Sequence, residues 1–222
     1  MTLSTRDYRH EFCSTPTAGL RAVAQELLIF RDSHPMIRAM RKATRPTARG
    51  LMESAATARA HLTALGTIPA VLERFGVPSG PLLQQVHLHP DDFSDPERSA
   101  TFGELDRLLG ACVRRTGCSH FGLLVGQSIS LESLGIAGRL ARNAPSVAKG
   151  LADLENFFIL HDSGAVPHVA ARGGSATFTY SIYAAGLRNA DQVYDIALAA
   201  MLNIMRQLCG TGWSADAVLL PR

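Results

Sequence analysis

The spacing of apolar and polar residues divides the chain into a helical part, a short alternating part and a final long helix. Apolar residues recur every three or four positions over residues 68–75, and Gly76 then supplies the left-handed residue that ends a helix. A shorter helix is expected over residues 81–86. The polar, proline-bounded stretch 87–96 is expected to be a surface connection.

Helix start signals recur further along the chain. Thr101 followed by Glu104 forms a capping box, and the apolar face behind it runs to Gly117. A second helix is expected over residues 121–127. Ser146 is placed to cap a third helix, whose apolar residues continue to position 158.

After Gly164 the period changes to alternation, which predicts a β-hairpin from residues 166–171 and 176–183. The longest helix follows, from Asn189 to Gly210, and a last short strand covers residues 217–220. These elements predict an α+β fold, mainly helical with a small antiparallel β-hairpin or sheet, in a single domain.

The N-terminal part has a different character. Residues 1–60 contain ten arginine and lysine residues against five aspartate and glutamate residues, and prolines interrupt the few apolar runs. We expect residues 1–60 to be a basic leader, disordered or marginally helical, ahead of a folded domain over residues 61–222. Nucleic-acid binding by this leader is not favoured, because its charges are dispersed and few aromatic residues lie between them.

Composition narrows the class of protein. Apolar residues make up 46% of the 222 residues, yet no run of about eighteen apolar residues indicates a membrane span. No secretory signal follows the N-terminal arginines, so a cytoplasmic location is expected. The four cysteines lack the close spacing of zinc or redox sites and are expected to be buried free thiols.

Three motifs in a fixed order carry a family resemblance. They are the segments FGVP at residues 75–78, FGLLVG at 121–126 and LGIAG at 134–138, followed by NAPSV at 143–147 and a helix. Over roughly residues 62–220 the chain resembles the arabinose-regulator-type ligand-binding domain found at the N-terminus of AraC/XylS-type transcriptional regulators. No single motif is diagnostic; their order carries the resemblance.

The resemblance implies a sensing domain that binds a small-molecule effector and mediates association as a homodimer, coupled to a C-terminal helix-turn-helix domain that binds DNA. No such helices are expected in this chain, which would then be a sensor truncated at its C-terminal end. The long helix over residues 191–209 is a candidate dimer interface, with burial inside the domain as the alternative. A stand-alone small-molecule-binding or interaction protein is the alternative function.

Enzyme chemistry is not indicated. His87 and His89 with Asp91 and Asp92 lack a third fixed ligand for a metal, and Cys118 has no oriented base. We therefore expect no catalytic residues, no metal and no cofactor.

Effector binding has candidate residues at the end of one helix and on the hairpin. They combine aromatic walls with a few polar groups, as small-ligand pockets do: Phe157, Phe158, His161, His168, Tyr180 and Tyr183. For each of them, packing in the core or on the surface is the alternative.

Overall fold

The computed structural model describes residues 28–31, 57–172, 175–184 and 186–219. The strands are β1 (Leu28–Arg31), β2 (Arg59–His61), β3 (Ser99–Thr101), β4 (Ala165–Arg172), β5 (Ser175–Ile182) and β6 (Ala217–Val218). The α-helices are α3 (Ile68–Arg74), α4 (Ser79–Gln84), α5 (Phe102–Thr116), α6 (Phe121–Gly126), α7 (Gly135–Arg142), α8 (Val147–Phe157) and α9 (Ala190–Cys209). Short 3₁₀ turns are η2 (Leu62–Leu65), η3 (Pro90–Phe93), η4 (Glu132–Leu134) and η5 (Phe158–Leu160).

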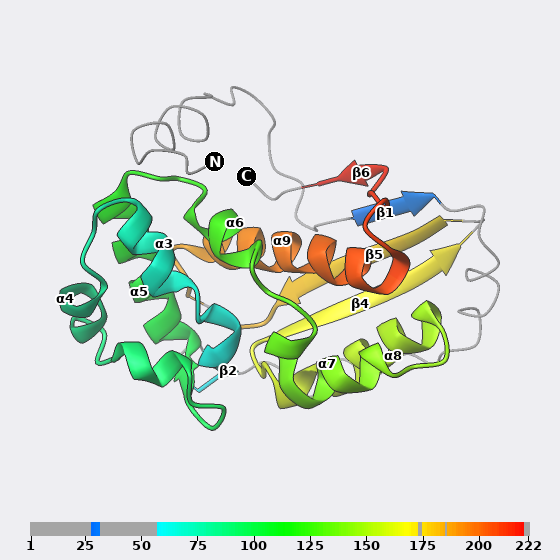
Figure 1. Ribbon diagram of the computed structural model, residues 1–222, viewed down its shortest axis with the longest axis horizontal. Helices are drawn as coiled ribbons and strands as arrows, with labels where there is room; N and C mark the ends of the chain where they lie inside the picture. The colour runs from blue at the N-terminus through cyan, green and yellow to red at the C-terminus, as the bar shows by residue number, and fades with distance from the viewer. Residues whose placement is uncertain (1–27, 32–56, 173–174, 185, 220–222) are drawn as a thin grey trace.

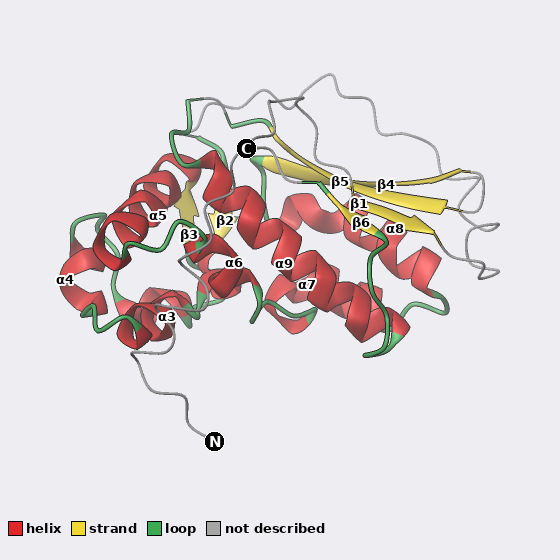
Figure 2. Cartoon of the chain, turned by 90° about the horizontal axis from the view of Figure 1, so that it is seen from above, coloured by secondary structure: helices red, strands yellow, loops and turns green. Residues whose placement is uncertain are grey.

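The strands form two antiparallel sheets. One has four strands in the order β4-β5-β1-β6, and the other pairs β2 with β3. Helices α7, α8 and α9 lie against one face of the larger sheet, and α3, α4 and α5 gather beside the smaller one (Figures 1 and 2). The expected α+β class with its antiparallel hairpin is confirmed.

The expected helix signals appear as real caps. Glu104 N–H donates to the Thr101 hydroxyl at 3.2 Å, while Thr101 N–H donates to the Glu104 carboxylate at 2.7 Å. The helix that they start ends at Gly117, in the left-handed conformation with φ 68°. Lys149 N–H donates to the Ser146 hydroxyl at the start of α8, also as the spacing predicts.

Asn189 does not cap α9 with its side chain. Its amide instead donates to the Asp106 carbonyl oxygen at 3.0 Å, and its own N–H donates to the Asp106 carboxylate at 2.7 Å. The residue therefore ties the start of α9 to α5.

The leader expected over residues 1–60 differs from the structure at two places. Leu28–Arg31 forms strand β1 between β5 and β6, where disorder or a marginal helix was expected. The domain boundary expected after residue 60 falls inside strand β2. Ala58 and Ala60, which precede that boundary, are already buried in the core. The remainder of residues 1–56 lies outside the described part of the chain.

Glycines explain why two helices approach each other closely. A Cβ atom at Gly122 would lie 2.3 Å from the Gln192 carbonyl oxygen, and one at Gly126 would lie 2.4 Å from that of Ile196. Only glycine fits at such distances, so α6 packs directly on the backbone of α9. The glycines of the FGLLVG segment are therefore packing residues.

The cysteines follow the expectation only in part. Cys112 and Cys118 are buried, whereas Cys209 at the end of α9 is exposed. Burial raises the pKa of the Cys112 thiol to about 12. Cys13 lies outside the described residues.

Candidate functional site

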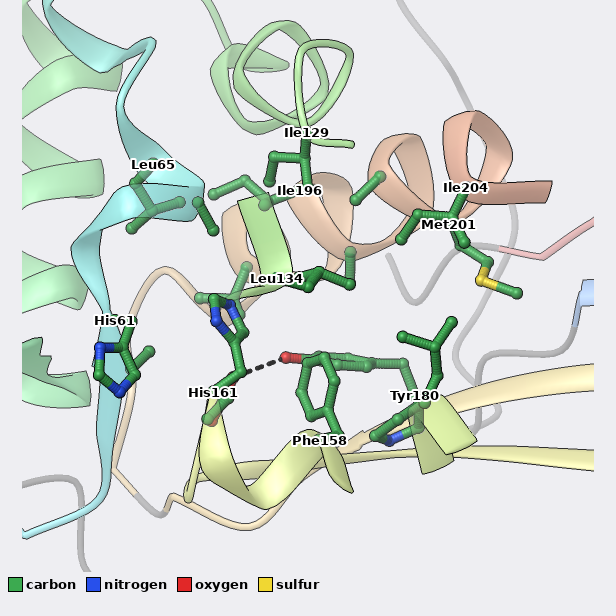
Figure 3. Close-up of a pocket in the computed structure, with 18 of the residues that line it drawn as sticks. His61, Leu65, Ile129, Leu134, Phe158, His161, Tyr180, Ile196, Met201 and Ile204 are labelled. Carbon is green, nitrogen blue, oxygen red and sulfur yellow. Dashed lines mark hydrogen bonds between the residues drawn. The ribbon is translucent and has the colours of Figure 1, made fainter. Parts of the chain in front are cut away.

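A cavity of about 100 Å³ lies between α9, the hairpin β4–β5, α5 and the segment β2–η2. Figure 3 shows Phe158, His161 and Tyr180 along one side and Ile129 and Ile196 opposite. An engineered apolar cavity of about 150 Å³ stays dry and takes up benzene, so a space of this order suits a ligand of about one ring.

Helix α9 supplies the longest apolar wall. Its lining residues recur at spacings of three and four: Val193, Ile196, Ala197, Ala200, Met201 and Ile204. Ala197 and Ala200 are the smallest of them and occupy the middle of the stripe. Because small side chains stand there, the helix and the sheet leave a space between them.

The position of this wall is fixed from the other side. Gln192 is buried and its side chain accepts from Gly122 N–H at 2.9 Å and donates to the Ser119 carbonyl oxygen at 2.8 Å. Together with the close glycine contacts, these hydrogen bonds hold α9 against α6.

Polar side chains gather at one end of the cavity, around Asp162. The Tyr180 hydroxyl donates to Asp162 Oδ2 at 3.0 Å, and Oδ1 accepts from the N–H groups of Gly164 at 2.8 Å and Ala165 at 3.1 Å. Burial raises the pKa of the Asp162 carboxyl to about 7, although these hydrogen bonds act in the opposite direction.

His161 is the second titratable group at this end, and it is partly buried. Burial lowers its pKa to about 4, with a smaller contribution from His61, whose ring stacks on it at 6.1 Å. Phe158 contacts His161 and Tyr180 edge-on, with ring centroids 5.6 and 6.0 Å apart. The imidazole of His161 is therefore neutral at pH 7.

The structure brings three of the six sequence candidates to the cavity: Phe158, His161 and Tyr180. The other three do not line it. Phe157 is 40% exposed, because one residue along a helix rotates the side chain by about 100° relative to Phe158. His168 bonds Glu155 at 2.6 Å, and Tyr183 lies beyond the end of β5. The structure therefore brings Phe158, His161 and Tyr180 together at the cavity and places Phe157, His168 and Tyr183 apart from it, while a ligand-binding role for any of the six stays a prediction.

Sequence reasoning missed two polar residues of the cavity, Asp162 and His61. Asp162 directly follows the candidate His161 in the sequence, and this adjacency could have indicated that Asp162 belongs to the same site. No local pattern indicated His61, because its strand β2 is three residues long and pairs with β3 about forty positions away.

The loop that carries His89, Asp91 and Asp92 forms the start of the 3₁₀ turn η3. His89 Nδ1 accepts from Asp91 N–H, and Asp92 accepts from His89 N–H at 2.8 Å, so these residues cap η3. Within the described ranges no three His, Cys, Asp or Glu side chains are grouped so that they could hold a metal ion. None of the helices in those ranges combines the length and the apolar character that a bilayer crossing requires.

Comparison with known proteins gives one family match. A family model described as the N-terminal arabinose-binding domain of AraC transcription regulators matches residues 76–222. No curated protein matches the chain. The match includes α9, the hairpin and three residues of the polar end, His161, Asp162 and Tyr180, but it begins after His61 and Leu65.

Proposed function

The chain belongs to the family of arabinose-binding N-terminal domains of AraC transcription regulators, and we propose that it senses a small-molecule effector in the cavity beneath α9. This family is one of ligand-binding domains of regulators and not of enzymes.

One observation carries the proposal: an apolar space inside the domain has its polar groups concentrated at one end. The polar lining side chains are His61, His161, Asp162 and Tyr180, and the remaining lining residues are apolar. Small-ligand sites have this make-up, with apolar walls for affinity and a few placed polar groups for orientation. Phe158, His161 and Tyr180, identified from the sequence, are assigned to this site, whereas Phe157, His168 and Tyr183 are not.

Binding here would act through α9. The helix faces the cavity on one side, packs on α6 on the other, and leads through Trp213 toward β6. A ligand that fits better when α9 takes one position shifts the population toward that position, and couplings of about 1–3 kcal/mol are typical. The rigid contact with α6 would carry this shift to the other helices.

We further propose that the sensor serves transcription control in the cytoplasm, self-associates, and leaves DNA binding to a separate helix-turn-helix domain. Helix α9 is not the surface proposed for self-association, since Gln192, Asp195 and Ile204 on it are buried inside the domain. Burial inside the domain, and not a dimer interface, explains the apolar stripe of α9. Light scattering at several concentrations measures whether a dimer forms.

The test of the effector site is a cavity-filling substitution. Ala197→Leu adds three carbons to the wall of the cavity, and Ala190→Leu makes the same change at the start of α9, outside the lining residues. A library of small metabolites is screened by thermal shift on the native chain. We expect hits whose stabilisation is lost in Ala197→Leu and kept in Ala190→Leu.

Equal stabilisation of both variants would place the ligand elsewhere and contradict the proposed site. The melting temperature of each unliganded variant is measured first, so that a general loss of stability is not mistaken for lost binding.

A further inference from the structure

The distribution of polar atoms around the cavity restricts the chemistry of the ligand that fits it. We infer that the ligand is an apolar molecule, about one ring in size, with a single non-anionic head group that donates hydrogen bonds, such as a hydroxyl or an amine. This inference rests on the proposed function and adds the ligand class. The inferred ligand differs in chemistry from arabinose, the sugar that the family's description names.

The two ends of the cavity differ in polarity. The labelled side chains in Figure 3 place His61, His161 and the Tyr180 hydroxyl toward one end, and Met201 and Ile204 toward the other. A ligand with one polar end and an apolar body therefore has one favourable orientation. A molecule with hydroxyl groups on all sides would place some of them against the apolar side chains of Met201 and Ile204, where they find no hydrogen-bond partner.

The polar end presents three acceptors, on Tyr180, Asp162 and His61, and the neutral ring of His161 adds one N–H donor and one acceptor nitrogen. The Tyr180 hydroxyl donates its hydrogen bond to Asp162, so its oxygen presents only lone pairs to a ligand. At pH 8, above its pKa of about 7, the Asp162 carboxyl is ionised, and its Oδ2 accepts from Tyr180 with capacity for a second donor. His61 Nδ1 lies 3.0 Å from the Pro96 carbonyl oxygen and must donate to it, which makes Nε2 of the neutral ring an acceptor.

No cation balances an anionic head group there. The lining residues include no lysine or arginine, within the part of the chain that the structure describes, and the buried Asp162 adds like charge when ionised. A carboxylate or phosphate would be desolvated without a counter-charge. Its binding is expected to be weaker than that of the corresponding alcohol by a factor of ten or more.

A free sugar fits poorly for a different reason. A pentose carries an oxygen atom on every carbon, most of them as hydroxyl groups, whereas the apolar walls of α5 and α9 contribute only aliphatic and aromatic side chains. Each hydroxyl that is buried without a partner weakens binding by roughly tenfold. A sugar would lose several such partners at once.

Four probes of similar size test the head group on the 222-residue chain at pH 8. Toluene has no head group, benzyl alcohol has a donor, benzoate has an anion, and L-arabinose is polar all round. Binding is measured by calorimetry and by ligand-observed NMR. We expect benzyl alcohol to bind at least ten times more tightly than benzoate and L-arabinose, and more tightly than toluene.

Tyr180→Phe removes the hydroxyl at the polar end, and Tyr183→Phe removes one that does not line the cavity. The preference for benzyl alcohol over toluene is expected to fall at least threefold in Tyr180→Phe and to stay unchanged in Tyr183→Phe. If Tyr180→Phe does not fold, the order of the four probes on the native chain decides the inference.

Benzoate or L-arabinose binding as tightly as benzyl alcohol would overturn the inference. The proposed function would survive that result if the binding were still lost in Ala197→Leu. Failure of all four probes would also overturn the inferred ligand class. Only the absence of any cavity-dependent hit in the metabolite screen would remove the proposed effector site as well.

Discussion

The hydroxyl of Tyr180 on strand β5 lies 3.0 Å from the carboxylate of Asp162, which is buried at the end of the cavity. Asp162 is buried and its neighbour His161 is partly buried, and the loss of hydration moves their pKa values in opposite directions, to about 7 and to about 4. Two adjacent residues therefore oppose each other in the pH dependence of stability.

The first prediction concerns this opposition. Asp162 binds its proton more tightly in the folded state, so its contribution to stability is present below its ordinary pKa of 3.8 and is lost as the pH rises to about 7. In Asp162→Asn this loss disappears. We expect the free energy of unfolding of this variant to rise from pH 4 to pH 6.5, because the His161 contribution is then unopposed.

The matching variant is His161→Gln. His161 is protonated more readily in the unfolded state, so its contribution is present above its ordinary pKa of 6.5 and is lost as the pH falls to about 4. Without it, stability should fall from pH 4 to pH 7. Urea unfolding at several pH values measures both slopes, and slopes of the same sign in the two variants would contradict the burial of these groups.

The second prediction concerns the contact between α6 and α9. Gly126→Ala places a Cβ atom 2.4 Å from the Ile196 carbonyl oxygen and so forces the helices apart. A loss of about 1–3 kcal/mol or more in unfolding free energy is expected, as for overpacked cores. Gly80→Ala in α4 is the control, since a Cβ atom there meets nothing within 4 Å.

In that control, alanine should be neutral or stabilise by up to about 1 kcal/mol, because glycine lowers helix stability. Chemical denaturation compares the two variants. Equal effects at the two glycines would show that backbone propensity, and not the close contact, decides the outcome.

The third prediction concerns thiol reactivity. Cys112 is buried with a pKa raised to about 12, Cys118 is also buried, and Cys209 is exposed. In a Cys13→Ser variant, a thiol reagent should label Cys209 within the first minutes at pH 8 and the other two only after unfolding. Peptide mapping by mass spectrometry identifies the labelled positions, and early labelling of Cys112 would contradict its burial.

The fourth prediction concerns the cap of α5. Thr101→Ala removes the side-chain acceptor for Glu104 N–H and is expected to cost about 1 kcal/mol. Thr101→Ser keeps the hydroxyl and should cost a fraction of this. Thermal unfolding of the two variants measures the difference, and equal losses would show that the threonine methyl group matters more than the cap.

Local signals predicted most of the helices, because the residues that make them are neighbours in the chain. On α5, the capping pair Thr101 and Glu104 and the final Gly117 belong to one continuous segment. The apolar stripe of α9 likewise lies within that one helix. The same is true of the hairpin β4–β5, whose alternation is local. Strands β1 and β2 were missed, since each is short and its partner lies far away in sequence.

The sequence by itself determined most of the residues that face inward on the helices and the hairpin that it predicted, because periodicity depends only on local geometry. Only the tertiary structure decided that Ala197 and Ala200 leave a space under α9, and that Asp162 and His61 join its polar end. A cavity is a sum over side chains from several elements, and no pattern within one element reports that sum. The sequence pattern identified Phe158 and His161, which line the cavity, but grouped Phe157 with them although its side chain is exposed.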